Sequence, residues 1–225
     1  MNSQQVRTIL NSIYWMPSKK IPIQYVDAMN PAQRFVKRAF DVIASAVGMI
    51  LLSPAYLAIY VALKTREKSP IIFKQERIGY KGKPFYIYKF RTMRLDAELD
   101  GPRLASGEDD ERLTKIGKFL REHHLDELPQ LWNVFIGDMS MVGPRPERKF
   151  FIEKIMERDP RYVHIYKMRP GVTSEATLYN GYTSTVEKML ERLEMDLNYL
   201  RTRSLWGDLV ILIKTTTSII NGKKF

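Results

Sequence analysis

The sequence contains no cysteine and only three histidines among its 225 residues. The absence of cysteine excludes disulfide bonds, cysteine-ligated zinc sites and thiol nucleophiles. His123 and His124 are adjacent, which is not the spacing of a metal-binding pair on a helix, and we interpret them as a polar approach to the acidic residues that follow. The N-terminus also lacks the basic region, short apolar run and small-residue cleavage site of a signal peptide.

Positive charge is in excess. The chain has 36 Lys and Arg residues against 25 Asp and Glu residues, which gives a formal net charge of +11. This balance predicts attraction to anionic partners, which include membrane lipids, nucleic acid and phosphorylated substrates, and the charge alone does not choose among them. The length suits one sizeable core, with or without a small appendage.

Residues 42–63 form the one long uncharged apolar run, and a bilayer needs about 20 such residues. Because the run has no polar face, it favours membrane insertion over a buried core helix. Ser53 and Pro54 lie at its centre, where proline breaks or kinks a helix. Basic residues flank both ends of the run: Lys37 and Arg38 before it, and Lys64, Arg66 and Lys68 after it. A re-entrant helix hairpin explains the break and the two basic flanks together, and a kinked full span is the alternative.

Two segments rich in apolar residues, Pro70–Gln75 and Phe85–Phe90, are separated by glycine, proline and basic residues, which is typical of a β-hairpin. Lys89 and Arg91 are two residues apart, so they share a face of the second strand, where two cations could hold a nucleotide diphosphate. A solvated basic strand, or one held against lipid headgroups, is the alternative. The charged, turn-rich stretch Asp96–Arg112 predicts a mobile surface loop.

Residues 125–146 combine an acidic pair with a rigid basic turn. Asp126 and Glu127 stand just before an apolar helical run. We expect the helical stripe of this run to be buried: Leu128, Leu131, Trp132 and Phe135. Prolines on both sides of Arg145 fix the backbone, so that its guanidinium suits bidentate binding of an oxyanion. The stretch therefore predicts phosphate chemistry, with an ordinary helix-capping role for the acidic pair as the alternative.

The strings Leu-Asp-Glu-Leu-Pro-Gln-Leu-Trp-Asn-Val, Gly-Asp-Met-Ser and Val-Gly-Pro-Arg-Pro resemble the bacterial sugar transferase family, the monotopic phosphoglycosyl transferases that start glycan assembly on polyprenyl phosphate. The similarity extends from about Lys37 to Ile213 and is closest to small members with a minimal catalytic core. It includes the hairpin string Lys-Phe-Arg-Thr-Met. After Thr173 the family continues Gly-Trp-Ala-Gln-Val-Asn-Gly, whereas this chain has Ser-Glu-Ala-Thr-Leu-Tyr-Asn-Gly. This departure bears on sugar identity more than on reaction class.

The resemblance implies transfer of a sugar 1-phosphate from a UDP-sugar to undecaprenyl phosphate with release of UMP, at the start of capsule, exopolysaccharide, O-antigen or glycoprotein glycan assembly. It implies that Asp126 is a nucleophile that forms an aspartyl-phosphosugar intermediate. It also implies Mg²⁺ held by Glu127, with Asp138 as a competing ligand. The phosphate-binding residues expected from it are Lys89, Arg91, Arg145 and Arg169.

We therefore predict an α+β protein: a mainly helical catalytic domain with a small β-hairpin, anchored by one N-terminal re-entrant membrane helix broken at Ser53-Pro54. The predicted parts are a polar or interfacial segment (1–36), the membrane hairpin (37–66) and a catalytic domain with C-terminal amphipathic helices (67–225). The predicted location is the cytoplasmic face of the bacterial inner membrane, in contact with lipid headgroups. The last helix carries an apolar stripe that either packs on the core or lies among headgroups: Leu205, Trp206, Leu209, Val210 and Ile213.

Two other classes of protein share some of these features. A non-catalytic scaffold held on anionic lipid explains the charge and the apolar run but leaves Asp126 and Glu127 without a purpose. A nucleic-acid binder explains the charge alone and disagrees with the apolar run, so we expect no nucleic-acid partner. The sequence leaves open which sugar is transferred and whether the protein forms a homodimer.

Overall fold

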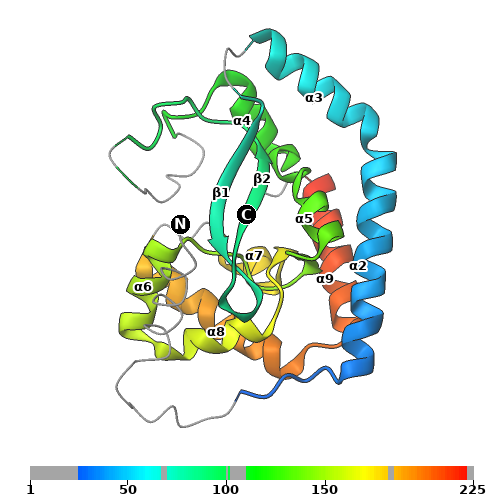
Figure 1. The fold of residues 1–225 in the computed structure, drawn as a ribbon, viewed down its shortest axis with the longest axis vertical. Coiled ribbons are helices and arrows are strands. Elements are labelled where there is room, and N and C mark those ends of the chain that lie inside the picture. The colour runs from blue at the N-terminus through cyan, green and yellow to red at the C-terminus, as the bar shows by residue number, and fades with distance from the viewer. Residues whose placement is uncertain (1–24, 67–69, 100, 102–109, 182–184, 222–225) are drawn as a thin grey trace.

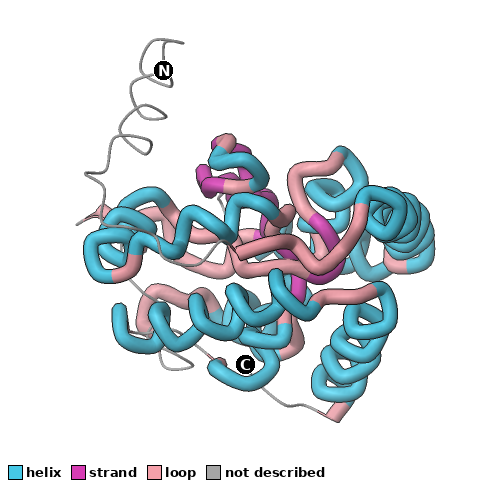
Figure 2. Tube along the Cα trace, turned by 90° about the horizontal axis from the view of Figure 1, so that it is seen from below, coloured by secondary structure: helices cyan, strands magenta, loops and turns pink. Residues whose placement is uncertain are grey.

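The computed structural model describes residues 25–66, 70–99, 101, 110–181 and 185–221. Most of the segment 1–36, and the centre of the predicted loop 96–112, lie outside the described residues. Within the described part, helices dominate and strands are confined to two small sheets (Figure 2). The α-helices are α2 (Pro31–Leu51), α3 (Ser53–Arg66), α4 (Lys115–Glu122), α5 (Gln130–Ile136), α6 (Lys149–Arg158), α7 (Glu175–Asn180), α8 (Val186–Thr202) and α9 (Leu205–Ile220). The 3-10 helices are η1 (Tyr80–Gly82), η2 (Leu125–Glu127) and η3 (Pro160–Lys167).

Helices α2 and α3 form a bent pair along one side of the molecule (Figure 1). Asn30 caps α2 and exchanges hydrogen bonds with Gln33 in a capping box. The pair bends by 59° at Leu52, and Pro54 then lies in the first turn of α3, where its missing N–H removes no helical bond. In the described chain no single helix is long and apolar enough to cross a membrane, whereas α2 and α3 together meet the criteria of length and composition.

Helix α2 turns a polar stripe toward the protein. Lys37 pairs with Asp208 of α9 at 2.5 Å and donates to the Val142 carbonyl at 2.9 Å. Asp41 accepts a hydrogen bond from the Met141 amide at 2.9 Å. The outward stripe is apolar and exposed: Phe35, Phe40, Ile43, Val47, Ile50 and Leu51. This polarity is the reverse of that of a helix packed on a soluble core, where the apolar stripe faces inward.

The predicted hairpin is confirmed as strands β1 (Ile72–Ile78) and β2 (Pro84–Phe90), which pair antiparallel. The first strand runs three residues further than predicted, to Ile78. The connection tightens through η1, in which Lys81 and Gly82 adopt left-handed φ values of 58° and 69°. The hairpin crosses the middle of the molecule (Figure 1), so β2 brings Lys89 toward the acidic residues.

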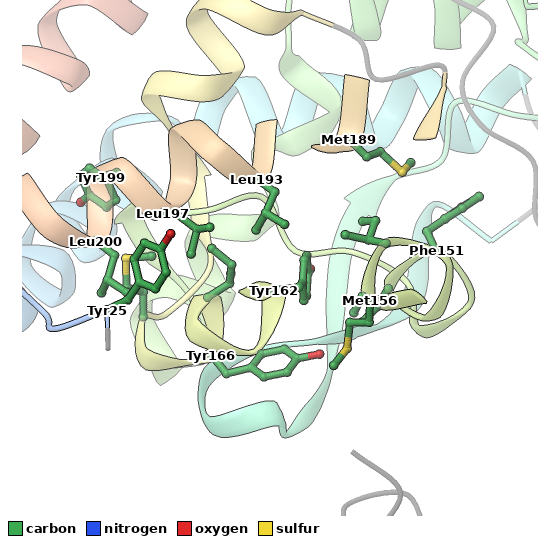
Figure 3. Close-up of a cluster of buried hydrophobic side chains, with 14 of the residues drawn as sticks. Tyr25, Phe151, Met156, Tyr162, Tyr166, Met189, Leu193, Leu197, Tyr199 and Leu200 are labelled. Carbon is green, nitrogen blue, oxygen red and sulfur yellow. The ribbon is translucent and has the colours of Figure 1, made fainter. Parts of the chain in front are cut away.

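A second sheet, absent from the sequence prediction, pairs β3 (Ser140–Val142) with β4 (Gly171–Thr173) in parallel. The backbones at Gly143 and Gly171 approach so closely that no side chain fits between them. A Cβ added to Gly171 would lie 2.1 Å from the Gly143 nitrogen. The main core lies between α6, η3 and α8 (Figure 3). Its labelled members include Phe151, Met156, Tyr162, Tyr166, Met189, Leu193, Leu197 and Leu200.

Two apolar stripes are more exposed than core packing allows, although Leu128 and Leu131 of the predicted stripe at α5 do pack inward. Trp132 and Phe135 of α5 are 48% and 37% exposed, so their predicted burial is wrong. The buried face of α5 is rotated toward Asn133, because that side chain bonds the backbone of β2 at Tyr86 and Tyr88. In α9 the exposed residues are Leu205, Trp206, Leu209 and Ile213. Their exposure disfavours core packing, one of the two roles considered for this stripe, and α9 contacts the core through Ile211 and Leu212.

Candidate active site

The acidic pair lies on a turn of its own, the 3-10 helix η2, between α4 and α5. His124 precedes it with a left-handed φ of 53°, a conformation that is uncommon for residues other than glycine. This reversal turns the chain sharply after α4, and Pro129 then separates the pair from α5. Asp126 is buried at 4% exposure. The sequence correctly places the pair before a helix but does not reveal the separate turn.

Two cations converge on Glu127. The Lys89 Nζ atom lies 2.5 Å from Glu127 Oε1, and an Arg145 nitrogen lies 3.1 Å from the same oxygen. Lys89 is also 4.0 Å from Asp126 Oδ2. Within the described chain, Asp126 accepts no hydrogen bond. Glu127 therefore holds the two cations in place, while the neighbouring carboxylate stays available to a reacting group.

The surroundings move the pKa values of the two carboxyl groups in opposite directions. Burial raises the pKa of Asp126, with a further rise from Glu127 and partial opposition from Lys89. Burial also acts to raise the pKa of Glu127, but the charges of Lys89 and Arg145 outweigh it and hold that pKa well below its usual range. Burial lowers the pKa of Lys89, against the charge of Glu127. Adjacent carboxyl groups with pKa values pushed apart suit different chemical roles.

Arg145 is carried by a braced loop. The Pro144 carbonyl accepts from the Gly171 amide at 2.9 Å, and the Pro146 carbonyl accepts from Arg77 at 3.1 Å. The next residue, Glu147, is buried and forms an ion pair with Arg192 of α8. The rigidity predicted from the two prolines is therefore reinforced by contacts from β1, β4 and α8.

The remaining candidate residues contact other groups. Arg91 donates to the Pro70 carbonyl at 2.8 Å and lies over the Phe73 ring. Arg169 donates to the Gly137 carbonyl at 3.0 Å. Asp138 accepts from Asn133 at 3.4 Å. The structure thus brings Lys89 and Arg145 to the acidic pair, whereas Arg91, Arg169 and Asp138 have their described contacts elsewhere.

The acidic pair suits a metal ion shared with a substrate better than a protein-only metal cage. No group of three or more His, Cys, Asp or Glu side chains in the described residues is arranged to hold a metal. Both cationic contacts of Glu127 use Oε1, and no described residue bonds its Oε2. Mg²⁺ usually binds through one or two carboxylates plus substrate phosphates and keeps several waters, so Glu127 Oε2 fits this ion.

Two further residues that shape the site were missed by the sequence reasoning. Asn133 is fully buried and clamps β2 to α5, with its Nδ2 2.7 Å from the Tyr86 carbonyl. Tyr56 of α3 donates to the carbonyl of Leu128, the residue after the acidic pair. A polar residue inside the apolar string Leu-Trp-Asn-Val was a signal for Asn133. Nothing in the sequence pattern singles out Tyr56 within its apolar helix.

Comparison of the sequence with known proteins identifies the family of this chain. The model of the family described as "Bacterial sugar transferase" matches residues 32–222. A UDP-glucose:undecaprenyl-phosphate glucose-1-phosphate transferase of Klebsiella pneumoniae is 43% identical over 189 residues, covering 83% of this chain and 40% of that protein. One of the same description from Caulobacter vibrioides is 42% identical over 187 residues, covering 82% and 69%.

A third relative is named for a different sugar. It is a UDP-N-acetylgalactosamine-undecaprenyl-phosphate N-acetylgalactosaminephosphotransferase of Aeromonas hydrophila, 37% identical over 193 residues, covering 86% of this chain and 45% of that protein. The chain thus spans less than half the length of the Klebsiella and Aeromonas relatives. The protein belongs to the bacterial sugar transferase family.

Proposed function

We propose that this protein transfers a sugar 1-phosphate from a UDP-sugar to undecaprenyl phosphate, giving undecaprenyl-diphosphate-sugar and UMP. The observation that carries the proposal is the buried Asp126 carboxylate, which has no hydrogen bond from a described residue and stands beside two cations held by Glu127. Phosphoryl transfer depends mainly on positioning and on neutralisation of charge. The site supplies a nucleophile and cations in a fixed arrangement, and the undecaprenyl-phosphate transferases among its relatives support this reaction class.

In the first step, a carboxylate oxygen of Asp126 attacks the β-phosphorus of the UDP-sugar. A bond forms between that oxygen and phosphorus, the bond from phosphorus to the bridging oxygen breaks, and UMP leaves with the electron pair. Burial raises the pKa of Asp126, and a higher pKa makes a carboxylate a better nucleophile. Lys89 and Arg145, which contact the acidic pair, would neutralise the diphosphate and the departing UMP.

In the second step, an oxygen of the lipid phosphate attacks the same phosphorus, and the bond to Asp126 breaks. The acceptor phosphate lies at headgroup depth, so the site must be held there. The bent pair α2–α3 and the exposed apolar stripe of α2 support a re-entrant anchor with both ends on the cytoplasmic face of the inner membrane. Lipid headgroups would then contact Lys64 and Arg66 in the last turn of α3.

Mg²⁺ is part of the proposal, with Glu127 as its protein ligand. When bound, the ion would supply positive charge to the phosphate oxygens of the donor. The described side-chain contact of Asp138 is with Asn133 and not with Lys89 or Arg145, so Glu127 is the preferred candidate. Arg91 and Arg169 donate to backbone carbonyls and have no described contact with the acidic pair, so we expect them to contribute less than Lys89 and Arg145.

The test is UMP release by the detergent-purified protein with Mg²⁺, undecaprenyl phosphate and a panel that includes UDP-glucose, UDP-galactose and UDP-N-acetylgalactosamine. We expect release with at least one donor, accompanied by transfer of the labelled sugar phosphate to lipid. Omitting the lipid should stop turnover after the first step. If no donor gives UMP with lipid and metal present, the transferase proposal is overturned in favour of a membrane-surface scaffold.

A further inference from the structure

Tyr56 connects helix α3, part of the proposed membrane anchor, to the turn that carries Asp126 and Glu127. It lies in the first turn of α3, three residues after Ser53, and it is half-buried. Its hydroxyl donates to the Leu128 carbonyl, which directly follows Glu127. The same carbonyl accepts from the Leu131 amide at 3.0 Å. One carbonyl therefore joins the acidic turn, the start of α5 and helix α3.

The ring of Tyr56 makes a second contact that leads to the same site. It packs against Phe90 with ring centroids 5.6 Å apart, and Phe90 is the β2 residue next to Lys89. Tyr56 thus touches both the turn that carries Asp126 and the strand that carries Lys89. Among the hydrogen bonds between described residues, its hydroxyl provides the one from an α3 side chain to this turn.

We propose that Tyr56 is a positioning residue that fixes the orientation of the Asp126 turn relative to the bent helix pair. The inference rests on the proposed function. The pair bends at Leu52, so without a tether α3 can change its angle to the catalytic turn. Because the donor comes from water and the acceptor phosphate from the membrane surface, a small change in that angle misaligns the attacking oxygen with phosphorus.

The test compares Tyr56→Phe with wild type in the UMP-release assay. Phenylalanine keeps the ring against Phe90 and removes only the hydroxyl, and Leu128 retains its bond from Leu131. We expect kcat to fall roughly fivefold, the change that corresponds to about 1 kcal/mol for one hydrogen bond. KM for the UDP-sugar should stay within about twofold, because the contacts of Lys89 and Arg145 are preserved.

Tyr60→Phe is the matched control. Tyr60 lies one turn further along α3, is 48% exposed, and its hydroxyl bonds no described residue. We expect wild-type kcat and KM for it. Tyr56→Leu, which also removes the ring contact, should lower kcat further than Tyr56→Phe.

The outcomes separate this inference from the proposed function. If wild type releases UMP and Tyr56→Phe shows the same kcat, the positioning role is overturned, whether or not its thermal midpoint falls. An equal loss in Tyr60→Phe would also overturn it, because the effect would then belong to any hydroxyl on α3. If wild type itself is inactive with every donor, the proposed function fails instead.

Discussion

Replacing Lys89 by methionine removes the cation that lies between the two carboxylates while keeping the length of the side chain. In the wild type Lys89 Nζ lies 2.5 Å from Glu127 and 4.0 Å from Asp126. The Lys89 and Glu127 side chains are 18% and 15% exposed, so the pair is mostly but not fully withdrawn from water. Without Lys89, Glu127 keeps Arg145 at 3.1 Å as its described partner.

The magnitude of the effect follows from this partial burial. Surface ion pairs contribute up to about 1 kcal/mol, and breaking a fully buried pair costs about 3–5 kcal/mol. Because Arg145 remains, we expect a loss of about 2 kcal/mol in the free energy of unfolding, which lies between these limits. For a chain of this size that loss corresponds to a fall of roughly 4–8 °C in the thermal midpoint.

Lys89→Met should also lose more activity than its lower free energy of unfolding accounts for. Removing one group that stabilises transition-state charge typically costs about 100- to 1,000-fold in kcat, so we expect a loss of this size in UMP release below the unfolding temperature. Lys83→Met is the control, because Lys83 is exposed at the other end of the same hairpin. It should match wild type in both assays.

The pH dependence of the loss gives a further check. Glu127 has a folded-state pKa below its unfolded value near 4.5, in spite of the burial that acts to raise it, because of Lys89 and Arg145. A carboxyl of this kind contributes stability above the unfolded pKa and loses it as pH falls through the folded pKa. The gap between wild type and Lys89→Met should therefore be wider at pH 7 than at pH 4. Equal stability and activity of Lys89→Met and wild type at pH 7 would refute the reasoning.

Two other predictions concern the neighbourhood of the site. Arg145→Ala should reduce UMP release by about 100-fold or more, and Arg91→Ala by less than about tenfold, since Arg91 contacts Pro70 and Phe73; equal losses in this assay would contradict the geometry. Burial raises the pKa of Asp196 to about 7 from 3.8, with Arg192 opposing and Glu147 adding to the rise. Because the folded state keeps this proton longer than the unfolded state, stability falls as pH rises from about 4 to about 7. Asp196→Asn should therefore raise the thermal midpoint more at pH 8 than at pH 4, and a pH-independent effect would exclude this role.

The sequence predicted those parts of the fold that are determined by residues close together in the chain. The hairpin was predicted because β-branched and aromatic runs are bounded by glycine and proline. The bend at Leu52 was predicted within two residues because proline cannot continue a helix without disruption. Of the basic residues expected near the acidic pair, Lys89 and Arg145 lie beside it, whereas Arg91 and Arg169 contact other groups.

The orientation of helix faces could not be predicted from the same patterns. Trp132 and Trp206 were expected on stripes that could be buried, yet both are exposed. Apolar periodicity identifies a helix face but does not tell whether protein or lipid covers it. Asn133 is buried because it bonds the backbone of β2, a partner 45 residues away in sequence. The parallel pairing of β3 with β4, and the tether from Tyr56, depend on equally long-range contacts.

The most direct test of the account is a single-turnover experiment without lipid acceptor. Wild-type protein, Mg²⁺ and the active UDP-sugar are mixed, and UMP and the intact mass of the protein are measured together, beside Asp126→Asn. The account predicts a burst of about one UMP per protein and a mass increase equal to the sugar phosphate in the wild type, and neither in the variant. UMP release without any mass increase, or an adduct that persists in Asp126→Asn, would contradict the assignment of Asp126 as the nucleophile.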